Sequence, residues 1–433
     1  MILEPGSPSP SAAHRARRAP RRGAGVLAVG LGNVAILVLG LVSGVIASRV
    51  LGPELRGEFV AAQTWAGMSA VLLTLGVSQA VVTYRGEDRQ LTGPLLLQAA
   101  GTLIFGIVLF VALSVYGQRW LSAAGIVGGA ALMTSALASS TSAGYSQRLG
   151  RMTGAFQSVR LLPQAVGVVA LVVVWQSGSR DPNYWLLAVG LAVFVPSVLL
   201  MVALLGGPRA IRHVGRLRPP PELVRGAGSA FVIVVGSQLI YRLDSLLVAI
   251  YLPSYKVALY AVAVSAAGAC AAVGQAVGML TFSRMRGMDD PRKQRAIIRR
   301  GIVQALAVTA AVSVPLAVVA PWAIRIVYGS AFVPASGATR LLVLAAIPLA
   351  ADYLLVHALL SLSASRGAFR VQLLAAVLTV GLLAAAISNG SLALVALVSA
   401  GIYTLSATLL YVTAVRRISG AVITSSRADP RER

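Results

Sequence analysis

The sequence predicts an all-α membrane protein with about twelve transmembrane helices, six in each half of the chain. Hydrophobic residues make up 57% of the 433 positions, charged residues only 12%, and the mean hydropathy is +0.81. Soluble domains average about half apolar and a quarter charged residues. Apolar runs recur roughly every 20 to 40 residues and leave no polar stretch long enough to fold separately. Lipid is therefore the expected solvent.

Each predicted span is an apolar run of the length that a bilayer requires, about 20 residues, between charged or Pro/Gly-containing segments. The first half of the chain supplies six: Gly25–Ser48, Phe59–Tyr84, Gly93–Tyr116, Trp120–Ser142, Leu161–Trp175 and Tyr184–Leu205. The second half supplies six more: Ala227–Tyr251, Val257–Phe282, Gly301–Ile324, Leu341–Ser363, Val371–Ser388 and Leu392–Val415.

The basic residues predict the orientation of these spans. Of the 37 Lys and Arg residues, 29 lie in the two tails and the even-numbered loops, seven lie in the odd-numbered loops, and Arg242 lies within the seventh span. Short cytoplasmic loops hold an excess of Lys and Arg. We therefore expect a multi-pass protein of the cytoplasmic membrane with both termini in the cytoplasm.

The loops also suggest a domain organisation. We expect a disordered basic tail over residues 1–23, an N-terminal six-helix lobe over 24–206, a cytoplasmic linker over 207–226, a C-terminal six-helix lobe over 227–415 and a cytoplasmic tail over 416–433. The linker is the longest interior loop and contains Pro219, Pro220 and Pro221, as expected of a tether between two lobes.

Several function classes are not expected. The net charge of +24 could indicate nucleic-acid binding, but the basic residues form short clusters between spans and are not interleaved with stacking aromatics. Cys270 is the only cysteine and the three histidines are dispersed, so we expect no metal site and no cofactor. The chain contains no GxxxxGK[ST] phosphate loop, which argues against ATP hydrolysis by that mechanism.

Three segments resemble one known family, in the expected order. Ala47–Gly86 reads ASRVLGPELRGEFVAAQTWAGMSAVLLTLGVSQAVVTYRG, in which LGPxxRGEF is the most specific pattern. Tyr241–Ala263 reads YRLDSLLVAIYLPSYKVALYAVA, and Ile324–Ala346 reads IRIVYGSAFVPASGATRLLVLAA. They resemble the polysaccharide flippases, carriers of lipid-linked oligosaccharide of the O-antigen type. This family belongs to the superfamily that also holds the multidrug and toxin extrusion (MATE) proteins and the lipid II flippases.

The resemblance implies a MATE-like, lipid II flippase-like fold, in which two six-helix lobes surround a central cavity that opens alternately to each side of the membrane. It implies a transporter rather than an enzyme. The implied cargo is an oligosaccharide on undecaprenyl diphosphate, moved from the inner to the outer leaflet for cell-surface polysaccharide synthesis. The expected partners are this lipid-linked oligosaccharide, membrane lipids, and a polysaccharide polymerase and glycosyltransferases, with no nucleic acid.

A diphosphate crossing the membrane requires hydrogen-bond donors and positive charge, for which arginine is well suited. Arg242 is a candidate substrate-binding residue because it lies about 22 Å of helical rise into the seventh span. The alternative is an arginine that extends to the outer headgroups. Arg49 and Arg56 flank the first outside turn, where they could guide the diphosphate out or act as interfacial anchors.

Three other residues are candidates for ion coupling. Asp244 lies two positions after Arg242 and about 200° around the helix, so it could contact a neighbouring helix or bind a cation. Asp352 lies near mid-membrane, four residues after Pro348, where it could be a proton or sodium site or a protonated structural group. His357, five positions further on, is a weaker candidate of the same kind.

Two other functions remain open. An ion-coupled multidrug exporter of the related branch would favour an acidic cavity for cationic drugs, which Arg242 opposes. A membrane-embedded polysaccharide polymerase or glycosyltransferase would require catalytic residues on a sizeable loop, whereas every predicted outside loop is short.

Overall fold

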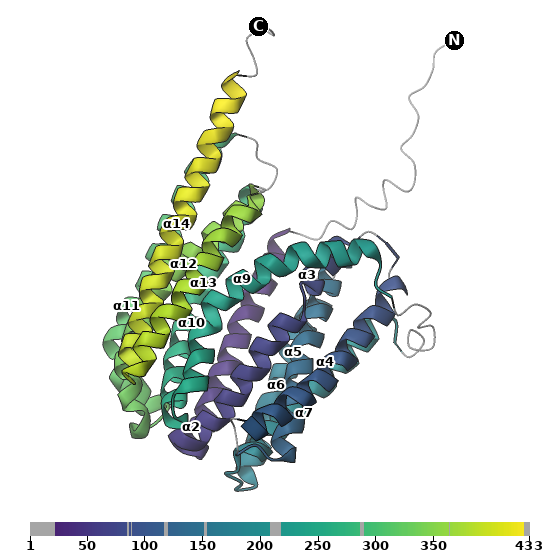
Figure 1. Cartoon of the computed structure of the whole chain (residues 1–433), viewed down its shortest axis with the longest axis vertical. Helices are drawn as coiled ribbons and strands as arrows, with labels where there is room; N and C mark the ends of the chain where they lie inside the picture. The colour runs from purple at the N-terminus through teal and green to yellow at the C-terminus, as the bar shows by residue number, and fades with distance from the viewer. Residues whose placement is uncertain are drawn as a thin grey trace.

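The computed structural model describes residues 22–427, except 85, 88, 117–119, 151–153, 208–217, 286–289 and 363. The described residues form twelve α-helices and one short 3-10 helix, with no strand among them (Figure 1). The all-α membrane fold predicted from the sequence is thus confirmed. Most of residues 1–23, and half of the predicted 207–226 linker, lie outside the described residues.

The first half of the chain forms an N-lobe of six helices. They are α2 (Arg22–Leu73), α3 (Val77–Thr83), α4 (Arg89–Tyr116), α5 (Ala123–Arg148), α6 (Ala155–Gln176) and α7 (Pro182–Leu204). α7 begins where an Asp-Pro pair favours a helix start: the Asp181 side chain accepts from the backbone N–H of Asn183 at 2.9 Å, and Pro182 occupies the first helical position.

The second half forms a C-lobe. Its elements are α9 (Pro221–Tyr251), α10 (Ser254–Met285), α11 (Pro291–Val327), the 3-10 helix η1 (Ser330–Ala335), α12 (Ser336–Ser361), α13 (Ser365–Ser388) and α14 (Leu392–Arg427). Several helices are longer than the apolar runs inside them. α14 continues through the described part of the expected C-terminal tail, and α9 begins within the expected linker.

α2 supplies two membrane passes because it bends sharply at Gly52. Gly52 has φ 72° and ψ 179°, which is left-handed backbone that a glycine adopts without strain, and Pro53 follows it. A Cβ at Gly44 would lie 3.6 Å from Nη2 of Arg56, although a straight helix would separate these residues by about 18 Å. The two arms of α2 therefore face each other as the first and second spans.

Ten of the helices are long and apolar enough to cross a membrane, counted over the described residues. This count takes α2 once, and it does not include α9, whose side chains at 229–230 and 232–239 are outside the described set. The outer surface is correspondingly apolar: Ile104 is 64% exposed and Val377 is 62% exposed, while Ser197 and Ser406 are fully buried. Lipid-facing helices show this pattern, because acyl chains solvate apolar side chains and leave polar groups to pair inside.

The two lobes meet at the end of the bundle that contains the α2 bend, which we call the Gly52 end. A Cβ on Gly57 would overlap the carbonyl oxygen of Ser254, the first residue of α10. η1 also contacts α2 at this end. At the opposite end, where α2 begins and α14 ends, α9 packs on α3, so that a Cβ on Gly226 would lie 3.4 Å from the Cβ of Ala80. Figure 1 shows α14 extending beyond the other helices there.

Candidate functional site

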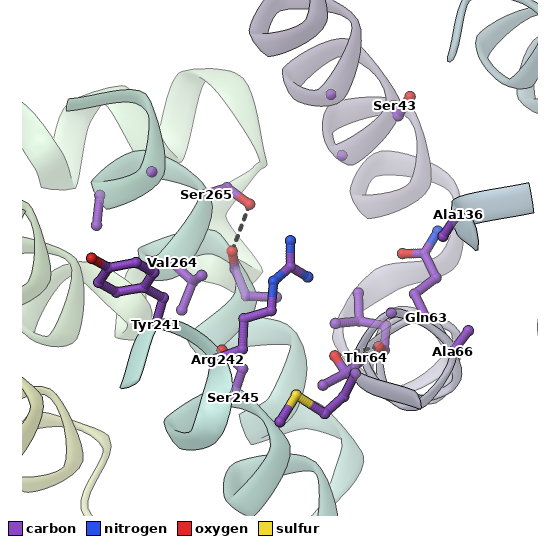
Figure 2. A pocket seen from close by; sticks show the side chains of 18 of the residues that line it. Ser43, Gln63, Thr64, Ala66, Ala136, Tyr241, Arg242, Ser245, Val264 and Ser265 are labelled. Atoms are coloured by element: carbon purple, nitrogen blue, oxygen red, sulfur yellow. Dashed lines mark hydrogen bonds between the residues drawn. The ribbon is translucent and has the colours of Figure 1, made fainter. Parts of the chain in front are cut away.

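A cavity of about 1060 Å³ lies between the two lobes. Its N-lobe wall comes from α2, α3, α5, α6 and α7, and its C-lobe wall comes from α9, α10, α12 and α14. Figure 2 shows part of it, with Gln63 and Thr64 of α2 across an open space from Tyr241 and Arg242 of α9. The volume is slightly above the range of about 300 to 1,000 Å³ that is usual for small-molecule sites.

Arg242 is the most exposed cation of this cavity. Its side chain lines the cavity and extends from α9 toward α2, where a Cβ on Gly67 would lie 3.4 Å from Nη1. No carboxylate among the described residues lies within 4 Å of its guanidinium, since the only ion pair found there joins Lys293 and Asp290. The cationic head therefore projects into the open space between the lobes (Figure 2).

Asp244 is bound to neighbouring helices instead of to Arg242. It is 2% exposed and contributes to the cavity wall. Its Oδ2 accepts from the hydroxyl of Tyr260 on α10 at 2.6 Å and from Ser399 on α14 at 3.2 Å, and its Oδ1 accepts from the backbone N–H of Ser245 at 2.6 Å. This carboxylate thus joins three helices of the C-lobe through neutral donors.

Asp352 lies behind the cavity wall and is fully buried. Its carboxylate accepts from Tyr241 of α9 at 2.9 Å, from Gln372 of α13 at 3.2 Å and from Ser406 of α14 at 2.5 Å. No Lys or Arg among the described residues lies within 4 Å of it. Tyr241 does line the cavity, so its side chain connects the buried carboxylate to the cavity surface.

His357 is half-buried and lines the same wall. Its Nδ1 lies 2.8 Å from the carbonyl oxygen of Tyr353, and the two rings lie 4.4 Å apart. The Tyr353 ring in turn lies 6.3 Å from the ring of Tyr241. An aromatic row therefore runs along α12 and α9 between His357 and the hydroxyl that binds Asp352.

Arg56 and Arg49 lie at the Gly52 end, one inside the protein and the other at its surface. Arg56 is 3% exposed, lines the cavity, and packs over the rings of Tyr328 and Phe332 at 5.3 Å from each centroid. Its Nε and Nη1 are buried without a hydrogen-bond partner among the described residues. Exposed Arg49 donates from Nε to the carbonyl of Val327 at 3.0 Å and from Nη2 to that of Ile326.

The structure thus gathers four of the six candidate residues, Arg56, Arg242, Asp244 and His357, on one cavity, and places Asp352 directly behind it. Arg49 instead binds the C-terminal end of α11. Sequence reasoning missed the neutral partners of the two carboxylates, namely Tyr241, Tyr260, Gln372, Ser399 and Ser406. An amide such as that of Gln372 inside an apolar run was the available signal, because a buried polar group needs a partner.

The site has no arrangement suited to a metal cluster. Within the described ranges, no group of three or more His, Cys, Asp or Glu residues could hold a metal ion. Cys270 is buried and unpaired with another cysteine. The chemistry that the described geometry offers is recognition of an anion by guanidinium groups, and binding of a single cation or proton by a carboxylate.

The fold matches several solved transporters. The chain superposes on the lipid II flippase MurJ in an inward closed conformation with a TM-score of 0.69, 13% identity, and coverage of 91% of this chain and 90% of that chain. An inward-facing multidrug resistance MATE family transporter of the MOP superfamily gives a TM-score of 0.64, 14% identity, and coverage of 92% and 99%. The MATE transporter VcmN of Vibrio cholerae, in its bent form, gives a TM-score of 0.57 and 12% identity, with coverage of 93% of this chain and 98% of that chain.

The sequence itself matches one family model. The model is described as "Polysaccharide biosynthesis protein" and covers residues 46–337, which include all three segments that carried the resemblance except the last residues of the third. No curated protein sequence matches the chain. The family match extends over two-thirds of the chain and includes cavity-lining helices of both lobes, among them α5 to α7 and α9 and α10, but not the cavity-lining parts of α12 and α14.

Proposed function

This chain belongs to the polysaccharide biosynthesis protein family, and we propose that it is a flippase that moves undecaprenyl-diphosphate-linked oligosaccharide from the inner to the outer leaflet. The observation that carries the proposal is Arg242, a guanidinium that has no carboxylate partner among the described residues and faces a cavity of about 1060 Å³ between the lobes. A diphosphate cannot lose its hydration in hydrocarbon without compensating donors. A forked, permanently charged guanidinium supplies them.

Arg56 is the second anion-binding residue in this proposal. Gly67, which faces Arg242, lies eleven positions after Arg56 on the same arm of α2, or about 16 Å of helical rise. The two arginines therefore bind the diphosphate at successive depths: Arg242 between the lobes and Arg56 near the Gly52 end. In the conformation described here Tyr328 and Phe332 cover the Arg56 guanidinium, and separation of the lobes would release it. Arg49 then acts at the exit, where it now holds the α11 terminus.

Asp244, Asp352 and His357 are the proposed ion-coupling residues. Both carboxylates are surrounded by hydroxyl and amide donors, and neither has a Lys or Arg nitrogen within 4 Å among the described residues, so each can take up a proton or a small cation with little rearrangement. Asp352 is bonded to Tyr241, the residue before Arg242, so ion binding at Asp352 acts directly on the helix that carries the cavity arginine.

The proposal also includes location and partners. Because the excess of basic residues follows the tails and even-numbered loops, we place both termini in the cytoplasm and the Gly52 end outside. A cytoplasmic-membrane flippase of this kind receives cargo from glycosyltransferases and delivers it to a polysaccharide polymerase.

The test is the pair of variants Arg242→Ala and Arg242→Lys. We expect Arg242→Ala to abolish surface polysaccharide in cells and translocation of fluorescent undecaprenyl-diphosphate oligosaccharide in proteoliposomes, while protein remains in the membrane. Arg242→Lys should retain partial activity, since a lysine keeps the charge but loses the fork. Wild-type translocation by Arg242→Ala would remove this residue from the site. Transport of cationic dyes, but not of the lipid-linked cargo, by the wild type would favour the multidrug exporter instead.

A further inference from the structure

The two walls of the cavity differ in chemistry. The C-lobe wall carries the ionisable and aromatic side chains: Arg242, Asp244, His357 and four tyrosines, Tyr241, Tyr260, Tyr353 and Tyr403. Among the described residues that line the N-lobe wall there is no tyrosine, and the only charged one is Arg56 at the Gly52 end. Its other polar residues are neutral, and we call five of them the glutamine wall: Gln63, Gln79, Ser135, Ser139 and Gln164.

Two amides of this wall are not used by the protein. Ser135 donates to a backbone carbonyl, Ser139 pairs with Ser197, and Gln79 accepts from Ser78. Half-buried Gln63 and exposed Gln164 form no hydrogen bond within the described part of the chain. Each primary amide offers two donors and one acceptor oxygen. These groups are therefore available to a hydroxyl-rich ligand in the cavity.

The position of Gln63 relates this wall to the diphosphate site. Gln63 and Gly67 are four residues apart on the second arm of α2, so they share one helix face about one turn apart. The guanidinium of Arg242 reaches α2 at Gly67. A diphosphate held by Arg242 would thus place the first sugar next to Gln63; Figure 2 shows these two residues on opposite sides of the cavity. Gln164 of α6 also lines this N-lobe wall.

From this arrangement we propose that the glutamine wall is the glycan-binding surface of the cavity and that it selects uncharged saccharides. The proposal rests on the flippase function, because it presumes a diphosphate at Arg242. Amides pair with sugar hydroxyls and acetamido groups as both donors and acceptors. Along the described part of this wall, an anionic sugar would find no cation beyond Arg56, and a cationic sugar would find no carboxylate. Burial of either charge without a partner is unfavourable.

The experiment compares two cargoes in proteoliposomes: undecaprenyl diphosphate carrying one neutral sugar, and the same carrier with a neutral oligosaccharide. The test variant is Gln63→Leu/Gln164→Leu, and the matched control is Gln275→Leu, the glutamine of α10 on the opposite wall of the same cavity. Size-exclusion profiles check that each variant folds. We expect the double variant to slow the oligosaccharide at least about tenfold, as the loss of two hydrogen bonds implies, and the single-sugar cargo less than about threefold.

The second part of the experiment measures whether transport depends on the charge of the saccharide. An oligosaccharide with a uronic acid should be carried at least about tenfold more slowly than its neutral counterpart, and Gln164→Lys should reduce this difference because it supplies a cation to the wall. Equal slowing of both cargoes by the double variant, the same length-selective loss in Gln275→Leu, or equal transport of charged and neutral glycans would overturn the proposal. Loss of all transport in Arg242→Ala with no cargo-length effect of the glutamines would leave the flippase function standing and reject only the glycan wall.

Discussion

The hydroxyl of Tyr241 lies 2.9 Å from Oδ2 of Asp352, and the next residue along α9 is Arg242. One helix therefore carries, on adjacent residues, a bond to a fully buried carboxylate and the most exposed cation of the cavity. The bond spans 111 residues of sequence. It joins the proposed ion site to the proposed cargo site through the side chain of a single residue.

Tyr241→Phe should uncouple ion binding from transport. The variant leaves Asp352 with its bonds to Gln372 and Ser406 but detaches it from α9. Loss of a hydrogen bond to a charged acceptor corresponds to about tenfold or more, so we expect ion-gradient-driven transport to fall by about that factor while transport down the cargo gradient changes less than twofold. The measurement is flux in proteoliposomes with and without an imposed gradient.

Ser406→Ala is the control for Tyr241→Phe. It removes a donor from the same carboxylate but from α14, without touching the helix of Arg242. If both variants lose gradient-driven flux equally, Asp352 needs its donors and the connection to α9 is not the coupling element.

Gly67→Val should obstruct the Arg242 site. A Cβ added at Gly67 would lie 3.4 Å from Nη1 of Arg242. The two methyl groups of valine would extend further and displace the guanidinium from its position over α2. We expect at least a tenfold loss of cargo transport, equivalent to about 1.4 kcal/mol, with normal membrane insertion. Gly40→Val is the matched control, because Gly40 lines the same cavity and a Cβ there meets nothing within 4 Å. Similar losses in both would point to general crowding instead of displacement of Arg242.

Gly57→Ala should shift the conformational equilibrium away from the state in which the two lobes contact each other at the Gly52 end. The added methyl overlaps the carbonyl of Ser254, so the lobes cannot approach as they do here. In a Cys270→Ala background, a cysteine placed at cavity-lining Val60 should react with a polar maleimide about tenfold faster when Gly57→Ala is present, since a shift of that size needs only about 1.4 kcal/mol.

Gly101→Ala is the comparison for Gly57→Ala, because a Cβ at Gly101 meets no atom within 4 Å. Unchanged labelling at Val60 in the Gly57→Ala protein would show that the contact with Ser254 does not hold the two lobes together.

The stability of the first turn of α11 should depend on pH because of Asp290. Backbone N–H groups of Lys293 and Arg292 donate to this carboxylate and hold its pKa below the usual 3.8. Because the folded-state pKa is lowered, the capping contribution is complete above about pH 4 and is lost as the pH falls through the lowered value. Hydrogen-exchange protection of the first turn of α11 should therefore decrease below pH 4.

Asp290→Asn distinguishes the effect of the titrating charge at this position from the effect of the capping hydrogen bonds. Asparagine caps helices about as well as aspartate but does not titrate in this range. The variant should keep a protected first turn whose protection no longer changes with pH, and a persistent pH step would assign it to another group.

The positions of the helices followed directly from the sequence. A span is defined by about 20 apolar residues in a row, so each helix from α4 to α14 appears where its apolar run predicted it. The segment between the predicted first and second spans, residues 49–58, contains Gly52 and Pro53, where α2 bends without ending. Asp181 and Asp290, each before a proline, start α7 and α11 for the same local reason.

The composition of the site was only partly visible in the sequence. A charged residue within a span is conspicuous, so Arg242, Asp244 and Asp352 stand out among the apolar residues around them. Glutamines and tyrosines within spans are less conspicuous, because they are tolerated at many depths. Gln63, Gln164 and Tyr241 become candidates only because the helices place them on the cavity.

By itself, the sequence determined that this chain is an all-α, multi-pass membrane protein, where most of its long helices lie, and which buried charges need an explanation, since length, apolarity and charge are local properties. Tertiary structure alone decided that Tyr241 bonds Asp352, that Tyr328 and Phe332 cover Arg56, and that Arg242 faces Gly67 across a cavity. Those relationships join residues far apart in the chain, and the packing of one helix against another fixes which of its faces meets a partner and which meets open space.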